Sequence, residues 1–132
     1  MKFDSLYIAL ASRMAEESHD PIYKVGALIV KDERIISNGW NGTPAGDDNA
    51  CRDKHGFTKP DVVHAEMNAL LKAARDGISV NGATIYCTYS PCPSCARAAR
   101  IAGIKRFAYR EQYRNPEGIL YLQERGIEVV QI

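Results

Sequence analysis

The 132-residue sequence lacks the features that mark several large classes of protein. No apolar run approaches the ~20 residues that cross a bilayer as a helix, and no internal repeat or low-complexity segment indicates a solenoid or a disordered scaffold. A net charge of +1 gives no global field to attract nucleic acid or an anionic membrane. What remains, 45% hydrophobic and 25% charged residues, is typical of a soluble globular protein, and we expect one domain over residues 1–132.

Cysteine is also scarce, with four residues in the chain: Cys51, Cys87, Cys92 and Cys95. The apolar start "LYIALAS" contains a stretch like a signal-cleavage site, but Asp4 interrupts its flank and the apolar run is short. We therefore expect a cytoplasmic protein. In that reducing compartment, cysteines are thiols or metal ligands rather than disulfides.

Hydrophobic periodicity predicts the element order αββαβαβαβ. Helices are expected at 4–17, 64–77, 92–103 and 116–126, and strands at 25–30, 34–39, 83–88, 105–110 and 127–132. The first two strands form a hairpin, and the last three are joined by helices, which requires right-handed crossovers between parallel strands. The prediction is an α/β fold, a three-layer α/β/α sandwich on a mixed five-stranded sheet.

Apolar spacing also predicts which faces of the first two helices turn toward the core. The stripe of the first helix is Phe3, Leu6, Leu10 and Met14, and that of the second is Met67, Leu70, Leu71 and Ala74. Between the hairpin and the second helix lies a stretch rich in Gly, Pro, Asn and Asp, residues 41–61. Irregular loops of this length are usually functional or mobile.

The segment "SPCPSC" places two thiols at the start of a predicted helix. Cys92 and Cys95 are three positions apart in its first turn, so both sulfurs can face one point. Unpaired backbone N–H groups and the positive end of the helix dipole favour thiolates there, which is the form that binds metal.

The earlier segment "HAE" opens another helix. Residues two apart do not share a helix face, so we expect His64 at the cap edge, where Glu66 still reaches the site. His64, Cys92 and Cys95 supply three ligands, and a zinc held by three protein ligands keeps a fourth position for water, as catalytic sites do. Glu66 is then placed to carry protons.

Two alternatives remain for the thiol pair. A thioredoxin-like redox pair would leave His64 and Glu66 without a role, and a closed structural zinc would need a fourth ligand, for which Cys87 or Cys51 is available. The combination H-x-E followed by P-C-x-x-C is the known signature of zinc-dependent nucleobase deaminases.

The chain resembles the cytidine deaminase superfamily, and within it the deoxycytidylate (dCMP) deaminases. The resemblance rests on "KVGALIV", "GWNGTPAG", "VVHAEMNALL", "GATIYCTYSPCPSCARAARIAGIKRFAYREQY" and "GIEVV", in order and spacing over most of the chain. It implies one catalytic Zn²⁺ per chain, conversion of dCMP to dUMP for thymidylate synthesis with dCTP as a further candidate substrate, and a homo-oligomer, commonly a hexamer.

The resemblance also assigns individual residues. It implies zinc ligation by His64, Cys92 and Cys95 and proton transfer by Glu66. Nucleotide contacts are implied for Asn41, Ala65, Tyr113 and Lys24, although Lys24 is equally an ordinary exposed lysine and Tyr113 a half-buried core aromatic.

Two departures from the family pattern leave further alternatives open. Members regulated by dCTP and dTTP carry G-Y-N-G, whereas this chain has Gly39-Trp40-Asn41-Gly42, so an effector site there is uncertain. Some viral members hold a second, structural zinc in a long insertion. Here that region offers only Cys51 and His55, with His19 as a third ligand, and solvated loop residues are the other interpretation.

Two competing functions follow from the same residues. The first is a tRNA adenosine deaminase, which the basic residues between Arg97 and Arg114 favour and the near-neutral net charge disfavours. The second is a non-catalytic zinc-stabilised binding module, which gives Glu66 no role. Because the net charge is near zero, nucleic acid and membrane partners are not expected.

Overall fold

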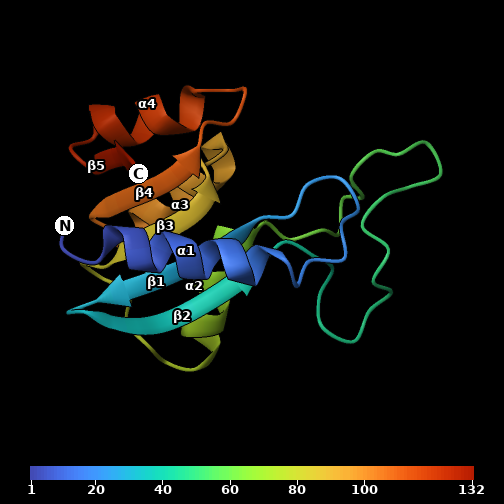
Figure 1. Ribbon diagram of the computed structural model, residues 1–132, viewed down its shortest axis with the longest axis horizontal. Coiled ribbons are helices and arrows are strands. Elements are labelled where there is room, and N and C mark those ends of the chain that lie inside the picture. The colour runs from blue at the N-terminus through green and yellow to red at the C-terminus, as the bar shows by residue number, and fades with distance from the viewer.

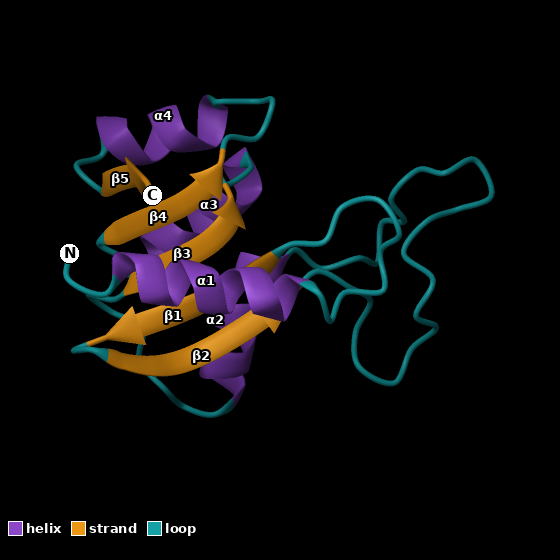
Figure 2. Ribbon diagram, viewed as in Figure 1, coloured by secondary structure: helices purple, strands orange, loops and turns teal.

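The computed structural model describes residues 1–132 and has the predicted order of elements (Figure 2). Its helices are α1 (Asp4–Ala15), α2 (Ala65–Arg75), α3 (Pro93–Ile101) and α4 (Glu117–Glu124). Its strands are β1 (Gly26–Lys31), β2 (Arg34–Trp40), β3 (Thr84–Tyr89), β4 (Arg106–Glu111) and β5 (Glu128–Gln131). None of the helices has the length and apolarity needed to cross a membrane.

The strands form one mixed sheet in the order β2-β1-β3-β4-β5. Strand β1 is antiparallel to both neighbours, and β3, β4 and β5 run parallel. Helix α1 covers one face, and α2, α3 and α4 cover the other (Figure 1). The predicted three-layer α/β/α sandwich is confirmed.

Both faces of the sheet are packed, which explains the continuous apolar runs of its central strands. Ile29, Ile85 and Phe107 are fully buried beneath α2, α3 and α4. Leu28 and Tyr86 lie on the opposite face against α1. Successive residues of a strand point to opposite faces, so each strand contributes to both halves of the core.

The predicted stripe of α1 is only half correct, because Phe3 and Met14 pack against the core but Leu6 and Leu10 do not. Leu6 and Leu10 are 49% and 37% exposed, and the buried residues of the helix are instead Asp4, Tyr7, Ile8, Ala11 and Ala15. The cause is the close approach of α1 to β1, where a Cβ on Gly26 would collide with the Ala11 carbonyl oxygen. Only the face with small side chains fits against the strand, and this rotates the leucines outward.

The predicted inner face of α2 is only partly correct. Leu70 is buried, but Leu71 and Ala74 are exposed, and Ala69 and Ala73 take their places. Again a glycine sets the rotation. A Cβ on Gly39 of β2 would lie 2.5 Å from the Ala65 carbonyl oxygen, so the strand crosses the first turn of α2 at backbone contact.

A buried ion pair joins the start of α1 to the start of β4. Arg106 donates from both terminal nitrogens to Asp4, at 2.9 and 2.7 Å, and the Tyr86 hydroxyl donates to the same carboxylate. The hydrogen bonds from Arg106 hold the pKa of Asp4 far below its ordinary value, and burial with the Asp4 contact raises the pKa of Tyr86 to about 12. This cluster ties α1 to the sheet.

We predict that Asp4→Asn lowers the free energy of unfolding by about 3 kcal/mol, because it leaves the buried Arg106 without its buried charge partner and with only the exposed Glu128. Glu128→Gln is the control, since Glu128 contacts the same Arg106 from a side chain that is 64% exposed, and it should cost less than about 1 kcal/mol. Urea unfolding measures both. Equal losses would contradict this account.

The contribution of Asp4 to the free energy of unfolding depends on pH. The pKa of Asp4 is lower in the folded chain than the value of about 3.9 in the unfolded chain, so its contribution is complete above about pH 4 and is lost as pH falls further. The stability gap between the parent and Asp4→Asn should therefore narrow below pH 4.

Candidate active site

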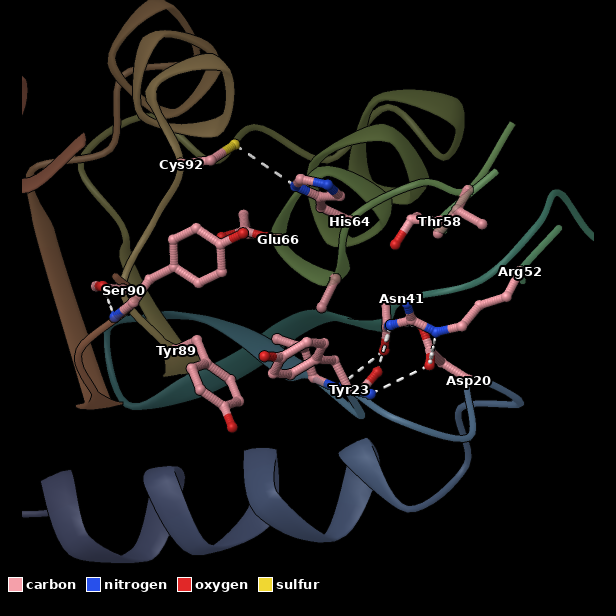
Figure 3. A pocket seen from close by; sticks show the side chains of 14 residues that line it. Asp20, Tyr23, Asn41, Arg52, Thr58, His64, Glu66, Tyr89, Ser90 and Cys92 are labelled. Carbon is pink, nitrogen blue, oxygen red and sulfur yellow. Dashed lines mark hydrogen bonds and ion pairs between the residues drawn. The ribbon is translucent and has the colours of Figure 1, made fainter. Parts of the chain in front are cut away.

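One edge of the sheet carries a pocket formed by the loops that meet there (Figure 3). Strands β2, β3 and β4 end at this edge and β1 begins at it, so Asn41, Ser90, Tyr113 and Val25 line one hollow. The loop before α2 and the amino ends of α2 and α3 complete the walls. Chain connections at the ends of strands commonly carry the functional groups of α/β proteins.

The three predicted ligands converge at this pocket, whose lining includes His64 and Cys92. His64 is the N-cap of α2 in an extended conformation, as expected from its spacing to Glu66, and Cys92 is the N-cap of α3. The His64 Nδ1 atom lies 3.5 Å from the Cys92 sulfur and 3.4 Å from the Cys95 sulfur. Tetrahedral zinc with ordinary bond lengths separates nitrogen and sulfur ligands by about 3.5 Å, so this donor set fits zinc.

The electrostatics of the pair also suit a metal cation. The Cys95 thiol and the His64 ring stabilise a thiolate on Cys92 and lower its pKa to about 4. The thiolate in turn raises the pKa of Cys95, because one proton is shared between the two sulfurs, and its hydrogen bond raises the pKa of His64. A bound divalent cation would displace that proton and hold both sulfurs as thiolates.

Glu66 lies in the first turn of α2 at the floor of the pocket and is only 4% exposed. Burial raises the pKa of its carboxyl group. The Cys87 thiol, on β3, donates to the Glu66 Oε2 atom at 3.9 Å. Cys87 is not part of the metal-ligand cluster, nor is the buried Cys51, so neither thiol closes the site as a fourth ligand.

Asn41 lines the pocket, and its side chain is also held by backbone groups. Its Oδ1 atom accepts the Val25 N–H at 2.8 Å, and its Nδ2 group donates to the Tyr23 carbonyl at 2.8 Å. Ser18 donates to the Asn41 carbonyl at 2.8 Å. The amide therefore fixes the loop before β1 against the end of β2. Ala65, which is fully buried, lines the pocket beside it.

The rest of the Gly39-Trp40-Asn41-Gly42 stretch also has structural contacts. Gly42 pairs with Val63 in an isolated bridge that joins the two ends of the long loop. The Trp40 ring faces the Lys72 ammonium at 5.4 Å. An effector site at this stretch stays a prediction.

Tyr113 and Lys24 are the two other residues predicted to contact the nucleotide, and only Tyr113 lines the pocket. Tyr113 lines it, and the Tyr113 N–H donates to the Ser90 hydroxyl at 2.6 Å, which ties the loop after β4 to the loop after β3. Lys24 is exposed and absent from the pocket lining, and its ammonium donates to the Ser18 carbonyl.

The proposed second metal site does not assemble. Cys51 is buried, with its thiol on the Asn49 carbonyl, whereas His55 and His19 are exposed. The only cluster of three potential ligands is His64, Cys92 and Cys95.

The structure adds pocket residues that the sequence did not single out. They are Asp20, Tyr23, Val25, Arg52, Thr58, Val62, Tyr89 and Ser90. Arg52 donates from Nε to Asp20 Oδ1 at 3.0 Å and from Nη2 to Oδ2 at 3.2 Å. Burial alone would raise the pKa of Asp20, but hydrogen bonds from Arg52 and two backbone N–H groups outweigh it, and the pKa lies below its ordinary value.

The basic residues between Arg97 and Arg114 do not form one patch. Arg106 is buried in its ion pair with Asp4. Arg110 donates to Ser12 of α1, whereas Arg97 and Arg100 belong to α3 on the opposite face of the sheet. These four arginines therefore lie at separate places on the fold.

Residues 1–111 match the family described as the cytidine and deoxycytidylate deaminase zinc-binding region. The chain belongs to this family. The matched range contains the His64, Cys92 and Cys95 cluster, which supports a zinc ion as its cofactor.

Relatives extend the match over nearly the whole chain. The deoxycytidylate deaminase of Enterobacteria phage T4 is 36% identical over 97% of this chain and 89% of its own. The dCMP deaminase of cyanophage S-TIM5, solved in complex with dCMP and dUMP, is 41% identical with a TM-score of 0.96, covering 99% of this chain and 97% of its own. A tRNA A34 deaminase structure has a TM-score of 0.67 and is 23% identical, covering 96% of this chain and 92% of its own. At this identity, the similarity shows a shared fold.

We predict about one zinc per chain by elemental analysis of protein purified without chelator. Cys95→Ser should lose the zinc and lower the melting temperature, because metal binding and folding are coupled. Cys51→Ser is the matched control, a buried thiol outside the cluster, and should keep its zinc. Loss of zinc in Cys51→Ser would revive a second site, and full zinc in Cys95→Ser would exclude the proposed ligand set.

Proposed function

We propose that the chain catalyses the hydrolytic deamination of a deoxycytidine nucleotide, from dCMP to dUMP and ammonia. The observation that carries the proposal is the buried Glu66 beside the His64, Cys92 and Cys95 cluster. The choice of dCMP is supported by the phage T4 and cyanophage relatives, which are named for that activity. The product, dUMP, is proposed to be the substrate for thymidylate synthesis.

The reaction replaces the 4-amino group of cytosine by the oxygen of water. When bound, zinc supplies a Lewis acid that lowers the pKa of a water molecule. Glu66 takes a proton from the attacking water and gives it to the ring nitrogen N3. As the C4–N bond breaks, Glu66 moves the second proton of that water, from the oxygen now on C4, to the amino group, which leaves as NH₃, and the ring keeps the new C4=O bond. No electrons are exchanged with a cofactor.

The positions of the other groups fit this chemistry. The amino ends of α2 and α3 both open on the pocket, and their unpaired N–H groups favour developing negative charge. Asn41, Ala65 and Tyr113 line the same pocket and are proposed to contact the nucleotide. A free nucleotide needs no base flipping, so a pocket serves in place of an open groove.

Several expectations from the family resemblance stay predictions. They are a single domain over 1–132, a cytoplasmic location, a homo-hexamer, and regulation by dCTP or dTTP. The four cysteines are free thiols, which agrees with a reducing compartment.

We predict that Glu66→Gln lowers kcat by at least about 10²–10⁴-fold, because glutamine cannot carry protons between water, N3 and the amino group. Zinc content and the unfolding transition should match the parent, since Glu66 is not a ligand. A dissociation constant for dUMP confirms that the pocket is intact. Parent-like turnover with zinc bound would exclude Glu66 as the proton carrier.

We predict that dCMP is deaminated faster than cytidine or a tRNA anticodon stem, measured as ammonia release at equal concentration, with CMP and dCTP assayed alongside to determine the sugar and the phosphate count. A phosphate held by charge-assisted hydrogen bonds contributes about 1.5–3 kcal/mol per bond. Preferential turnover of the tRNA stem would support the tRNA deaminase alternative. Zinc binding without turnover of any substrate would support the non-catalytic module.

A further inference from the structure

The pocket has one basic side chain outside the metal-ligand set. Among its lining residues only His64 and Arg52 are basic, and His64 belongs to the zinc cluster. Arg52 is therefore the only cation available to an anionic part of a ligand. A phosphate that leaves water needs such a partner, because an unpaired buried charge is strongly destabilising.

The guanidinium of Arg52 is held in a fixed orientation by its neighbours. Two of its N–H groups bind the Asp20 carboxylate, and Nη1 donates to the Gly56 carbonyl at 2.9 Å. The Tyr23 ring lies 5.7 Å from the guanidinium carbon. A guanidinium has five N–H donors, so one remains on each terminal nitrogen. A phosphate can accept from both without losing any existing contact.

Asp20 holds the guanidinium in this orientation, but Arg52 is not its only hydrogen-bond donor. It also accepts the backbone N–H groups of Ile22 and Tyr23, at 2.8 and 3.1 Å. Its side chain is 2% exposed, whereas that of Arg52 is 13% exposed, so the arginine is the accessible member of the pair. The ion pair thus directs its positive end toward the pocket.

Arg52 and the catalytic groups lie at different ends of the pocket. Figure 3 shows Arg52 and Asp20 at one end of the pocket, with Glu66 and Cys92 toward the other and Asn41 between. In a cytidine nucleotide, the amino-bearing edge of the base and the 5′-phosphate are at opposite ends of the molecule.

We propose that Arg52 binds the 5′-phosphate of the substrate and is the residue that selects a nucleotide over a nucleoside. The proposal rests on the proposed function and deepens it. It replaces Lys24, whose ammonium is turned to the Ser18 carbonyl, as the phosphate partner.

The test compares dCMP with deoxycytidine in the zinc-loaded full chain. In Arg52→Gln, the ratio of kcat/KM for dCMP to that for deoxycytidine should fall by about 10- to 100-fold. Lys54→Gln is the matched control. It removes one positive charge from the same loop at an exposed side chain outside the pocket lining, so the ratio should stay near the parent value.

A second measurement separates phosphate binding from catalysis. The probe 2-deoxyribose 5-phosphate, which lacks the base, should inhibit the parent competitively, and Arg52→Gln should weaken this inhibition about 10-fold or more. If Arg52→Gln does not fold, Arg52→Lys decides the question with the same two measurements, since lysine keeps the charge but loses the paired donors.

Specific outcomes would overturn the proposal. An unchanged substrate ratio together with unchanged inhibition in Arg52→Gln, or in Arg52→Lys where that variant is needed, would reduce Arg52 to a structural link between the loop and Asp20. An equal fall of the ratio in Lys54→Gln would show that the general positive charge of the loop, and not the Arg52 guanidinium, selects the phosphate. Failure of the parent to deaminate dCMP would instead refute the proposed function.

Discussion

Two helices begin at the same edge of the sheet, and the rest of the site depends on that constraint. Helix α2 leads into β3 and runs antiparallel to it, so it starts where β3 ends. Helix α3 follows β3 and therefore starts at the same edge. The cap residues of the two helices, His64 and Cys92, are consequently neighbours although 28 positions separate them. Right-handed connections and short turns leave the chain no other arrangement.

The stretch from Gly39 to Gly42 supports that arrangement through contacts with the backbone. Gly39 lets β2 touch the first turn of α2, which sets the height of His64 and Glu66 above the sheet. The Asn41 amide fixes the segment that enters β1. These contacts account for the glycine at position 39 and for the position of the Asn41 amide, whereas a Cβ on Gly42 would meet no neighbouring atom. An effector that binds there would act directly on the cap of α2.

The order of elements, the class of the sheet and the zinc ligands could be predicted from the sequence. Hydrophobic periodicity within short segments indicates the elements, and two short motifs contain the ligands. His64 was placed at the cap since residues two apart cannot share a helix face. Inner helix faces were harder to predict. Leu6 and Leu71 are exposed because close approach at glycines, which is a tertiary property, sets the rotation of each helix. Arg52 was missed because its partner is 32 positions away and its loop has no periodicity.

The two ends of the pocket are held by different means. At the catalytic end, the caps of α2 and α3 rest on core residues such as Ala65 and Ala96, which are fully buried. At the other end, Arg52 lies in an irregular loop and reaches the body through its ion pair with Asp20 and its contact with the Tyr23 ring, while its isolated bridge to Thr58 lies within the loop. None of these contacts involves a metal ligand or a residue of the hydrophobic core. The fold therefore allows recognition of the substrate's distal group to change while the deamination chemistry is retained.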